Sequence, residues 1–491
     1  MRSGPPPERG PSRSFLLLLA FAAVGAATPG CDCGASAQGG CKTDDDCRTL
    51  SCRAGEVPAC VEGACVCNPD VTLGDIGRFS SLAMRGPVAY LSAYNTTYGD
   101  LMIGHVAPPG VVSNWEFVDG VPANVPPDNP LSRVRGGVSE KGDDVGRYCS
   151  IAIDRHNDPL ISYYDATHGH LKFTSFGVIR WRPQVIDKGS GVPGKGGDDL
   201  GRYTSITLAA DGAPGIAYSA EVEKGASGKR ESQLRFAQAK KPDPQDPADW
   251  AVTVVETRPM PPPPMANETP PPLSPGVALF VSAARKADGA PVVAYYDAER
   301  GNLRYVEYDA AAKTWGAPVV LDGEDPAGKD TADVGQYPSV FVDDSGVAHI
   351  SYVDASHDNL LYVNTRTRTP EVVDDGYRPM DEKTLDGLDA PVYHLIGDSS
   401  SIQVKQGAVL IAYQDSTVSQ LRLATYEPMK KAWKLEVIAG HSSPFKGAYG
   451  FYAQNRLAGG TAVLSSYAVN QQKELPEFYV EVFGVLLGII Q

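Results

Sequence analysis

The sequence lacks clustered basic charge, a membrane-length apolar run and the short motifs of common hydrolases and nucleotide-binding proteins. Its formal net charge is −15, which argues against nucleic acid as a partner because binding phosphates requires clustered Lys and Arg. The apolar stretch Phe15–Ala27 is shorter than the roughly 20 residues that a transmembrane helix needs. No G-x-S-x-G, H-E-x-x-H or P-loop motif occurs, so the chain offers no catalytic signature of these classes.

Glycine and proline are abundant instead. The 491 residues include 51 Gly and 40 Pro, a composition that favours many short strands joined by turns over long helices. Hydrophobic residues make up 42% of the chain, which is enough for a substantial core. A chain of this length forms two to four average domains, or one large repeat array with small appendages.

Residues 1–30 have the layout of an export signal. A leader with Arg2, Arg9 and Arg13 precedes the apolar stretch, and small residues then lead to Cys31. This layout resembles a bacterial lipoprotein signal, which implies that Cys31 is the lipidated first residue of a protein at the outer membrane, the cell surface or in the periplasm. The alternative is cleavage near Ala26 or Ala27, which would release a secreted protein.

Residues 31–68 form a cysteine-rich segment that contains eight of the nine cysteines. In an exported chain, closely spaced cysteines predict disulfides that hold a segment too small for its own core. We expect three disulfides among Cys41, Cys47, Cys52, Cys60, Cys65 and Cys67, with the pairing left open. Zinc is the competing interpretation, although the segment has no His and no paired C-x-x-C. Cys149, outside this segment, is expected to be a buried free thiol.

From residue 69 to residue 491 the chain repeats one pattern. It is clearest in DVGRYCSIAIDRHNDPLISYYDATHGHL, which runs from Asp144 to Leu171. The position that ends the second apolar strand of successive units is occupied by Asn95, Asp165, Ala220, Asp297, Asp354, Asp415 and Val469. Fifteen residues earlier, or fourteen in the first unit, stand Ser81, Ser150, Ser205, Ser282, Ser339, Ser400 and Gln454. Two proline-rich stretches, Val121–Leu131 and Pro259–Pro275, lengthen the intervals and are interpreted as surface loops.

Each unit has the pattern of four short antiparallel strands, and a tryptophan precedes the fourth strand in most units. Such units, repeated about every 55–60 residues, are typical of β-propeller blades, because stacking in a ring covers both apolar faces of each blade. We therefore expect an all-β fold with a seven-bladed propeller of four-stranded blades, with six or eight blades as alternatives and tandem β-sandwiches less favoured. The fourth strand of the last unit is expected from Val485–Ile490 or from Val71–Leu73. The chain resembles secreted bacterial lipoproteins with sialidase-like or lectin-like propellers, but lacks a family-specific catalytic motif.

Two recurring acidic positions form the main candidate site. One row precedes the first strand and consists of Asp75, Asp144, Asp199 and Asp333; the other ends the second strand and consists of Asp165, Asp297, Asp354 and Asp415. In an up-and-down blade these positions open on the same face, so eight carboxylates would line one mouth and attract cations or a basic partner. Carboxylate oxygens suit calcium, the one cofactor that the sequence suggests. The competing interpretation is that each Asp hydrogen-bonds its own turn.

Aromatic and histidine side chains are further candidates. Tyr163, Tyr164, Tyr295 and Tyr296 could stack on sugars, but regular placement favours packing between blades, and the same holds for the tryptophans. His168 and His170, with His156 nearby, are the only histidine cluster in the sequence. Metal binding competes there with simple exposure in a turn.

A propeller fold does not choose between binding and catalysis. We expect a non-enzymatic binding or scaffolding protein that presents one face of the ring to a protein or glycan at the cell envelope. The alternative is a polysaccharide hydrolase or lyase that uses mouth carboxylates as acid and base. The irregular third unit, with Ala220 at the Asp position, makes Asp199 and Glu221 the first residues to test for catalysis.

Overall fold

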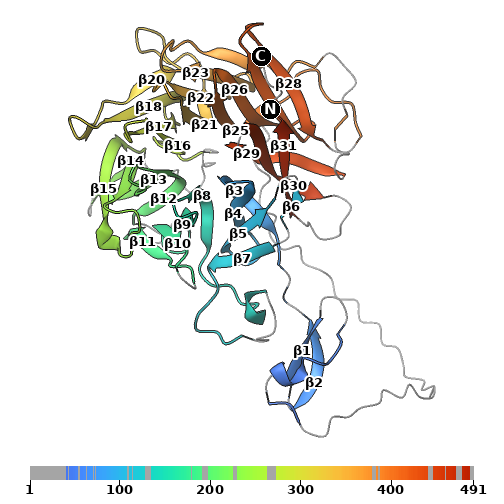
Figure 1. The fold of residues 1–491 in the computed structure, drawn as a ribbon. Coiled ribbons are helices and arrows are strands. Elements are labelled where there is room, and N and C mark those ends of the chain that lie inside the picture. Colours follow the sequence, from blue (N-terminus) through green and yellow to red (C-terminus); the bar gives the residue numbers. More distant parts are fainter. Residues whose placement is uncertain are drawn as a thin grey trace.

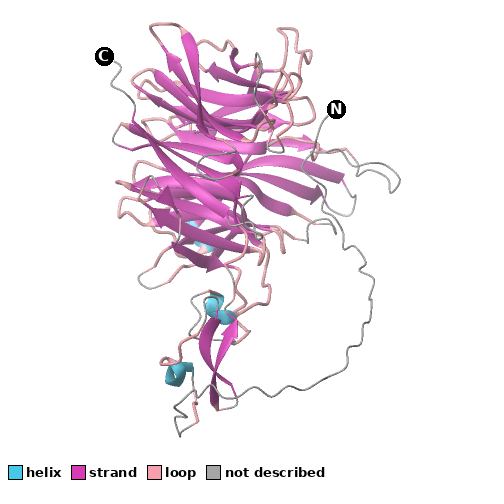
Figure 2. Cartoon of the chain, turned by 90° about the vertical axis from the view of Figure 1, so that its right-hand side faces the viewer, coloured by secondary structure: helices cyan, strands magenta, loops and turns pink. Residues whose placement is uncertain are grey.

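The computed structural model describes residues 40–486 except 43, 53–55, 62, 70, 72, 108–109, 113, 128–133, 178–179, 191–196, 225–228, 262–272, 379–382, 385–386, 441–445, 459 and 471–477. The predicted export signal and Cys31 lie outside these residues. Strands dominate, and the helices among the described residues are short 3₁₀ turns (Figure 2). None of the described helices has the length and apolarity needed to cross a membrane.

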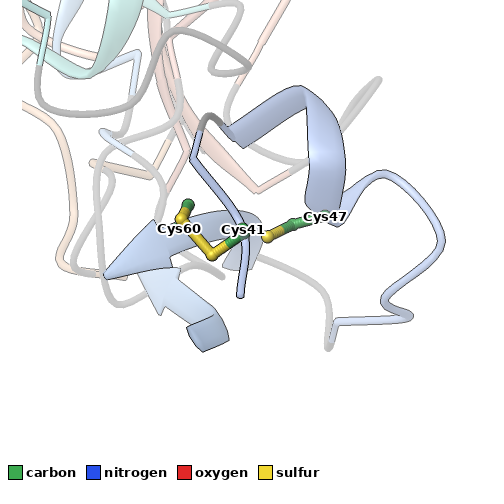
Figure 3. Close-up of side chains that lie close together, drawn as sticks. All are labelled: Cys41, Cys47 and Cys60. Carbon is green, nitrogen blue, oxygen red and sulfur yellow. A yellow bond between two sulfur atoms is a disulfide. The ribbon is translucent and has the colours of Figure 1, made fainter. Parts of the chain in front are cut away.

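The cysteine-rich segment folds as a small hairpin that stands beside a ring of sheets (Figure 1). It contains η1 (Asp44–Cys47) and the antiparallel strands β1 (Glu56–Val61) and β2 (Ala64–Pro69). Its disulfides join Cys41 to Cys60, Cys47 to Cys65 and Cys52 to Cys67. The sulfurs of Cys41, Cys47 and Cys60 gather closely (Figure 3), but as disulfides they hold no thiolate for a metal. The prediction of three disulfides is confirmed, and the zinc interpretation is wrong.

The ring consists of antiparallel sheets, here called blades 1 to 7 in chain order. Blade 1 contains β3 (Ile76–Arg85), β4 (Val88–Asn95), β5 (Asp100–Val106) and β7 (Asn114–Asp119). Blade 2 contains β8 (Val145–Ile153), β9 (Pro159–Asp165), β10 (His170–Ser175) and β11 (Gln184–Asp187). Blade 3 contains β12 (Asp199–Leu208), β13 (Pro214–Lys224), β14 (Lys229–Ala239) and β15 (Trp250–Pro259). The short helices η2 (Arg135–Gly137) and η4 (Pro247–Asp249) lie in connections.

Blades 4 to 7 continue the ring. Blade 4 contains β16 (Leu279–Arg285), β17 (Pro291–Asp297), β18 (Asn302–Asp309), β19 (Thr314–Trp315) and β20 (Val319–Asp322). Blade 5 contains β21 (Val334–Val342), β22 (Ala348–Asp354), β23 (Asn359–Asn364) and β24 (Glu371–Asp374), and blade 6 contains β25 (Ile396–Lys405), β26 (Ala408–Asp415), β27 (Gln420–Glu427) and β28 (Ala432–Ala439). Blade 7 contains β29 (Gly447–Ala458), β30 (Thr461–Asn470), β31 (Phe478–Leu486) and β6 (Gly110–Val111). The inner strands contact one another in the order β3, β8, β12, β16, β21, β25 and β29, and β29 returns to β3.

The prediction of seven four-stranded blades needs correction. Among the described residues, six blade sheets have four strands, and the sheet of blade 4 has five. Its outer strand is divided, since β19 and β20 both pair with β18. Pro318 lies between the two pieces and has no N–H to donate, which explains the interruption of the ladder.

Both expected sources of the last outer strand were wrong. Val485 lies within β31, the third strand of blade 7, and Val71 and Leu73 lie in no strand. The outer position is occupied by β6, which comes from the connection between β5 and β7 of blade 1 and pairs with β31 through Glu481 and Val111. The propeller is therefore closed by a strand that blade 1 lends to blade 7.

The second strand of each blade carries much of the core. Every residue of β9 and of β17 is buried, because these strands pack against neighbouring blades on both faces. Trp250, Trp315 and Trp433 each lie edge-on against an aromatic ring of the preceding blade, at 5.0 Å, 5.2 Å and 5.6 Å between ring centroids. These tryptophans are packing residues, as expected. Cys149 is buried and free, and burial raises its pKa to about 12.

Candidate functional site at the channel mouth

The loop into the first strand and the turn between the second and third strands lie on the same face of each blade. The Asp144 N–H donates to Thr167 Oγ1 at 2.7 Å, and the Ala166 N–H donates to the Asp144 carbonyl at 2.7 Å. The same side-chain contact recurs from Asp75 to Thr97 and from Asp333 to Ser356. Both acidic rows therefore lie on one face, as predicted, and we call it the mouth face.

The first acidic row joins neighbouring blades. Tyr94 donates to Asp144 at 2.9 Å, Tyr164 to Asp199 at 2.6 Å, Tyr296 to Asp333 at 2.6 Å and Tyr467 to Asp75 at 3.4 Å. In each pair the tyrosine belongs to the second strand of one blade, and the aspartate lies at the start of the first strand of the next or immediately before it. The contact from Tyr467 shows that Ala468, rather than Val469, is the equivalent of Asp165 in blade 7.

The second acidic row caps its own turns. One carboxylate oxygen of Asp165 accepts from the N–H groups of Thr167 and His168, both at 3.0 Å. Asp297 and Asp354 cap the two following N–H groups in the same way, and Asp415 accepts from one such N–H at 3.4 Å. Among the described residues, no three of the eight row carboxylates form a group within ligand distance of one ion. Calcium binding remains a prediction, because these contacts do not arrange the row carboxylates as ligands around one ion.

The first tyrosine of the Tyr-Tyr-Asp pattern bonds in the opposite direction around the ring. Its hydroxyl donates to an acid of the outer strand of the preceding blade, which is the last residue of that strand in four blades and lies within β15 in the other. The pairs are Tyr163–Asp119, Tyr218–Asp187, Tyr295–Glu256, Tyr352–Asp322 and Tyr413–Asp374. Burial, followed by the adjacent carboxylate, raises the pKa of each of these tyrosines well above its usual value. Tyr163, Tyr164, Tyr295 and Tyr296 thus tie blades together, which confirms the packing interpretation over sugar stacking.

An aromatic side chain from most inner strands faces its neighbours around the axis. The residues are Phe79, Tyr148, Tyr203, Phe280, Tyr337 and Tyr452, all with φ between 50° and 55°. Such φ values are uncommon for bulky residues; here each falls where the pairing of the first and second strands shifts register, the mark of a β-bulge. Consecutive centroids lie between 4.1 Å and 5.3 Å apart. Sequence reasoning missed this ring, although the recurring G-x-aromatic signal was visible.

Arginines precede the aromatic residue in the first three blades. They are Arg78, Arg147 and Arg202, half-buried or exposed. Arg147 and Arg202 each lie 2.6 Å from the aspartate of the first acidic row in their own blade. Burial opposes the charge of Arg202, but Asp199 and Tyr164 outweigh it, so its pKa lies above the usual value. The buried Nε of Arg202 has no hydrogen-bond partner among the described residues. One side of the mouth is therefore lined by arginines that each interact with an aspartate of the first acidic row.

Blade 6 breaks both patterns. The pairing of Ile396 with Asp415 and of Ser401 with Ala412 aligns Gly397 with Gly146, so Asp398 and Ser399 replace the arginine and the aromatic residue. Asp398 is exposed and accepts from Ser416 Oγ at 2.7 Å. Ser401, not Ser400, is then the serine of the repeat, and its Oγ accepts from the Asn455 N–H of blade 7 at 3.0 Å. The site irregularity predicted for the third unit is thus matched by a second one in blade 6 that sequence reasoning missed.

The long connections between blades also lie on the mouth face, because each leads into an inner strand. Among the described residues, the exposed large apolar side chains of these connections belong to residues 375–378, 383–384 and 387–395, which we call the mouth hairpin. Tyr377 and Tyr393 form an isolated bridge in it, with ring centroids 5.6 Å apart and residue exposures of 49% and 68%. Leu388 and Val392 add further exposed apolar surface.

A buried charged cluster anchors the mouth hairpin to blades 5 and 6. Arg378 contacts Asp374 with two nitrogens, at 3.0 Å and 2.8 Å, and lies 3.4 Å from Asp415. His394, also buried, places Nδ1 2.8 Å from the same Asp415 carboxylate. Burial opposes the charge of Asp374, but Arg378 and Tyr413 hold its pKa below the usual value. Tyr377 and Tyr393 are the sequence neighbours of Arg378 and His394, so these buried contacts hold the aromatic pair at the base of the hairpin.

The acids expected in the third unit are engaged in contacts. Asp199 bonds Tyr164 and Arg202, and Glu221 contacts Arg230 and accepts from Ser274 Oγ at 2.7 Å. These contacts give neither residue the environment of a free general acid or base.

The fold and this mouth define a β-propeller with an elaborated face. No protein-family model matches the sequence, and neither does any curated protein compared with it. Similar crystal structures include a puromycin hydrolase (13% identity, 83% of this chain and 54% of that chain, TM-score 0.47), a polysaccharide lyase (9%, 90% and 95%, 0.41) and the NanB sialidase from Streptococcus pneumoniae (12%, 85% and 69%, 0.39). The chain spans little more than half the length of the puromycin hydrolase. Similarity at this level carries no conclusion about activity.

Proposed function

We propose that the protein is an exported, lipid-anchored binding protein that presents the mouth face of its propeller to a glycan at the cell envelope. The observation that carries the proposal is the mouth hairpin, where Tyr377 and Tyr393 stand exposed on a buried ionic base. Exposed aromatic rings pack against the apolar faces of sugar rings, and exposed apolar clusters on soluble proteins mark binding surfaces.

Charge around the mouth favours an acidic glycan. Arg78, Arg147 and Arg202 lie in blades 1 to 3, which do not adjoin the hairpin between blades 5 and 6 in the ring order. A guanidinium has five N–H donors, so an arginine paired with one aspartate keeps donors for a second anion. Carboxylated or sulfated sugars supply such an anion. The overall charge of −15 then limits non-specific attachment to other polyanions.

Binding of the purified protein to immobilised neutral and acidic polysaccharides, with calcium present and then with chelator, tests this function. We expect retention on an acidic polysaccharide and at least a tenfold loss, about 1.4 kcal/mol, when Tyr377 and Tyr393 are both replaced by Ala. Met429→Ala is the matched control, since Met429 is 91% exposed but lies in a connection between the third and fourth strands, away from the mouth face. A blank screen, or equal losses in both variants, would contradict glycan binding and leave a protein partner as the alternative.

A polysaccharide hydrolase or lyase is the second candidate, and the break in blade 6 favours it. Asp398 is an exposed carboxylate at the one inner-strand position where the arginine and the aromatic ring are both replaced, and an active site needs such a departure from the repeat. Release of reducing ends or of unsaturated sugars from acidic polysaccharides would support it. Loss of that turnover in Asp398→Asn, with retention in Asp389→Asn of the mouth hairpin, would assign the acid; no turnover on any substrate would remove this candidate.

A further inference from the structure

The turn between β9 and β10 in blade 2 brings together three potential metal ligands. Asp165, His168 and His170 each offer a ligand atom, and these atoms lie within 4.8 Å of one another. His168 Nδ1 is 3.0 Å from Asp165 Oδ2, and the two imidazole rings stack with centroids 5.4 Å apart. Two nitrogen ligands on a tetrahedral zinc ion are roughly 3.3 Å apart, as follows from Zn–N bonds of about 2.0–2.1 Å. Small side-chain rotations therefore suffice to close the group around one ion.

The backbone sets this arrangement. Gly169, with φ of +67°, reverses the chain between the two histidines, so that both side chains come to the same side of the hairpin. Asp165 is held by the turn N–H groups described above, which orients its second oxygen toward His168. Asp143 Oδ2 lies 3.9 Å from His168 Nδ1 and can supply a fourth ligand. Lys188 also acts electrostatically on His170, in the direction opposite to that of Asp165.

Blade 5 supplies a natural comparison. Its turn, Asp354 to Asn359, matches the turn of blade 2 position by position, including an Asp–His pair at 2.8 Å and a residue of positive φ after the histidine. The difference at the last position is Asn359 in place of His170. The Asp–His contact is thus an ordinary feature of the turn, and the second histidine is what makes blade 2 different.

We propose that Asp165, His168 and His170 bind one divalent transition-metal ion on the mouth face, with Asp143 completing the site. Two imidazoles with carboxylate oxygens suit Zn²⁺, Ni²⁺ and Cu²⁺ rather than Ca²⁺ or Mg²⁺, which prefer oxygen ligands alone. The site is open to solvent, since the His168 side chain is 47% exposed. It is separate from the mouth hairpin and does not depend on the proposed glycan function.

The test is titration of the untagged, disulfide-intact protein with Zn²⁺ by calorimetry, and with Co²⁺ by absorption spectroscopy. We expect one equivalent to bind, with at least a tenfold weaker affinity in His170→Asn, which copies blade 5, and in His168→Ala. His357→Ala is the control and should leave affinity unchanged. Asn359→His should create a second equivalent, because it completes the same three ligands in blade 5.

Circular dichroism of each variant verifies that the ring is folded. The absence of binding by the wild type, equal affinity in His170→Asn, or an equal loss in His357→Ala would each overturn the proposal. Failure of Asn359→His to add an equivalent would show that Asp143 or another neighbour of blade 2 is required. In that case Asp143→Asn must weaken Zn²⁺ binding, and an unchanged affinity would count against the site.

Discussion

Removing the Tyr352 hydroxyl should destabilise the ring more than removing any equivalent hydroxyl. Tyr352 is fully buried and donates to Asp322 at 2.6 Å across the junction of blades 4 and 5. In other blades the cross-strand neighbour of this tyrosine is basic, as Arg304 is for Tyr295, but in blade 5 it is Leu361. Among the described residues, Asp322 keeps one other donor, the Gly323 N–H at 2.8 Å. Burial, with a smaller contribution from Asp354, raises the pKa of Asp322 despite both bonds.

The expected loss of stability depends on which donors the carboxylate keeps after the hydroxyl is removed. A hydrogen bond to a charged group contributes about 1.5–3 kcal/mol, against about 1 kcal/mol for a neutral one. Tyr352→Phe should therefore lower the free energy of unfolding by about 2 kcal/mol. Tyr413→Phe is the matched control, because Asp374 keeps two contacts with Arg378, and it should cost about 1 kcal/mol. For a ring of this size, 2 kcal/mol corresponds to a Tm shift of only about 2 °C, so denaturant titration is the better assay.

The pH dependence gives a second measurement on the same variants. Because the folded-state pKa of Asp322 is raised, its ionised form opposes folding, and protonation relieves this cost as the pH falls through the folded pKa. The excess cost of Tyr352→Phe over Tyr413→Phe should therefore shrink in acid. Asp322→Asn should likewise reduce the effect of Tyr352→Phe. Equal costs for the two tyrosine variants at neutral pH, or a larger cost for Tyr413→Phe, would refute the reasoning.

Three further outcomes are expected. The buried tyrosines that bond carboxylates have raised pKa values, so their contribution to stability is complete below pH 10, the ordinary tyrosine pKa, and is lost above it. Ultraviolet titration should therefore show tyrosinate forming together with unfolding. Ionisation of these tyrosines before the protein unfolds would contradict this prediction. Cys149, with its pKa near 12, should not react with thiol reagents until the ring unfolds; fast labelling of native protein would be inconsistent with its burial. Reduction of the three disulfides should unfold residues 40–69 while the melting of the ring stays unchanged; a lowered melting temperature would show that the hairpin supports the propeller.

Much of the ring could be predicted from the sequence, because each blade is specified by residues that are close together in the chain. Strand period, turn residues and the Tyr-Tyr-Asp pattern repeat along the chain, and each copy forms the same contacts with its neighbours. The divided outer strand of blade 4 depends on the single Pro318, and the outer strand of blade 7 comes from the far end of the chain; neither has a repeated signal. The candidate site was harder, because regular residues such as Asp144 proved structural. The informative positions were the exceptions, Asp398 and Ser399, which become visible only after strand pairing fixes the register of blade 6.

The lent strand β6 also sets an order of events during synthesis. Val111 pairs with Glu481, near the other end of the chain, so this contact cannot form until almost the whole protein has been made. Until then blade 1 carries a strand without its partner, and the last blade lacks its outer edge. Exposed strand edges are templates for pairing with other chains, and pairings so distant in sequence form slowly. A chain truncated before Phe478 would remain in that state, open at one seam and able to join another open ring edge to edge.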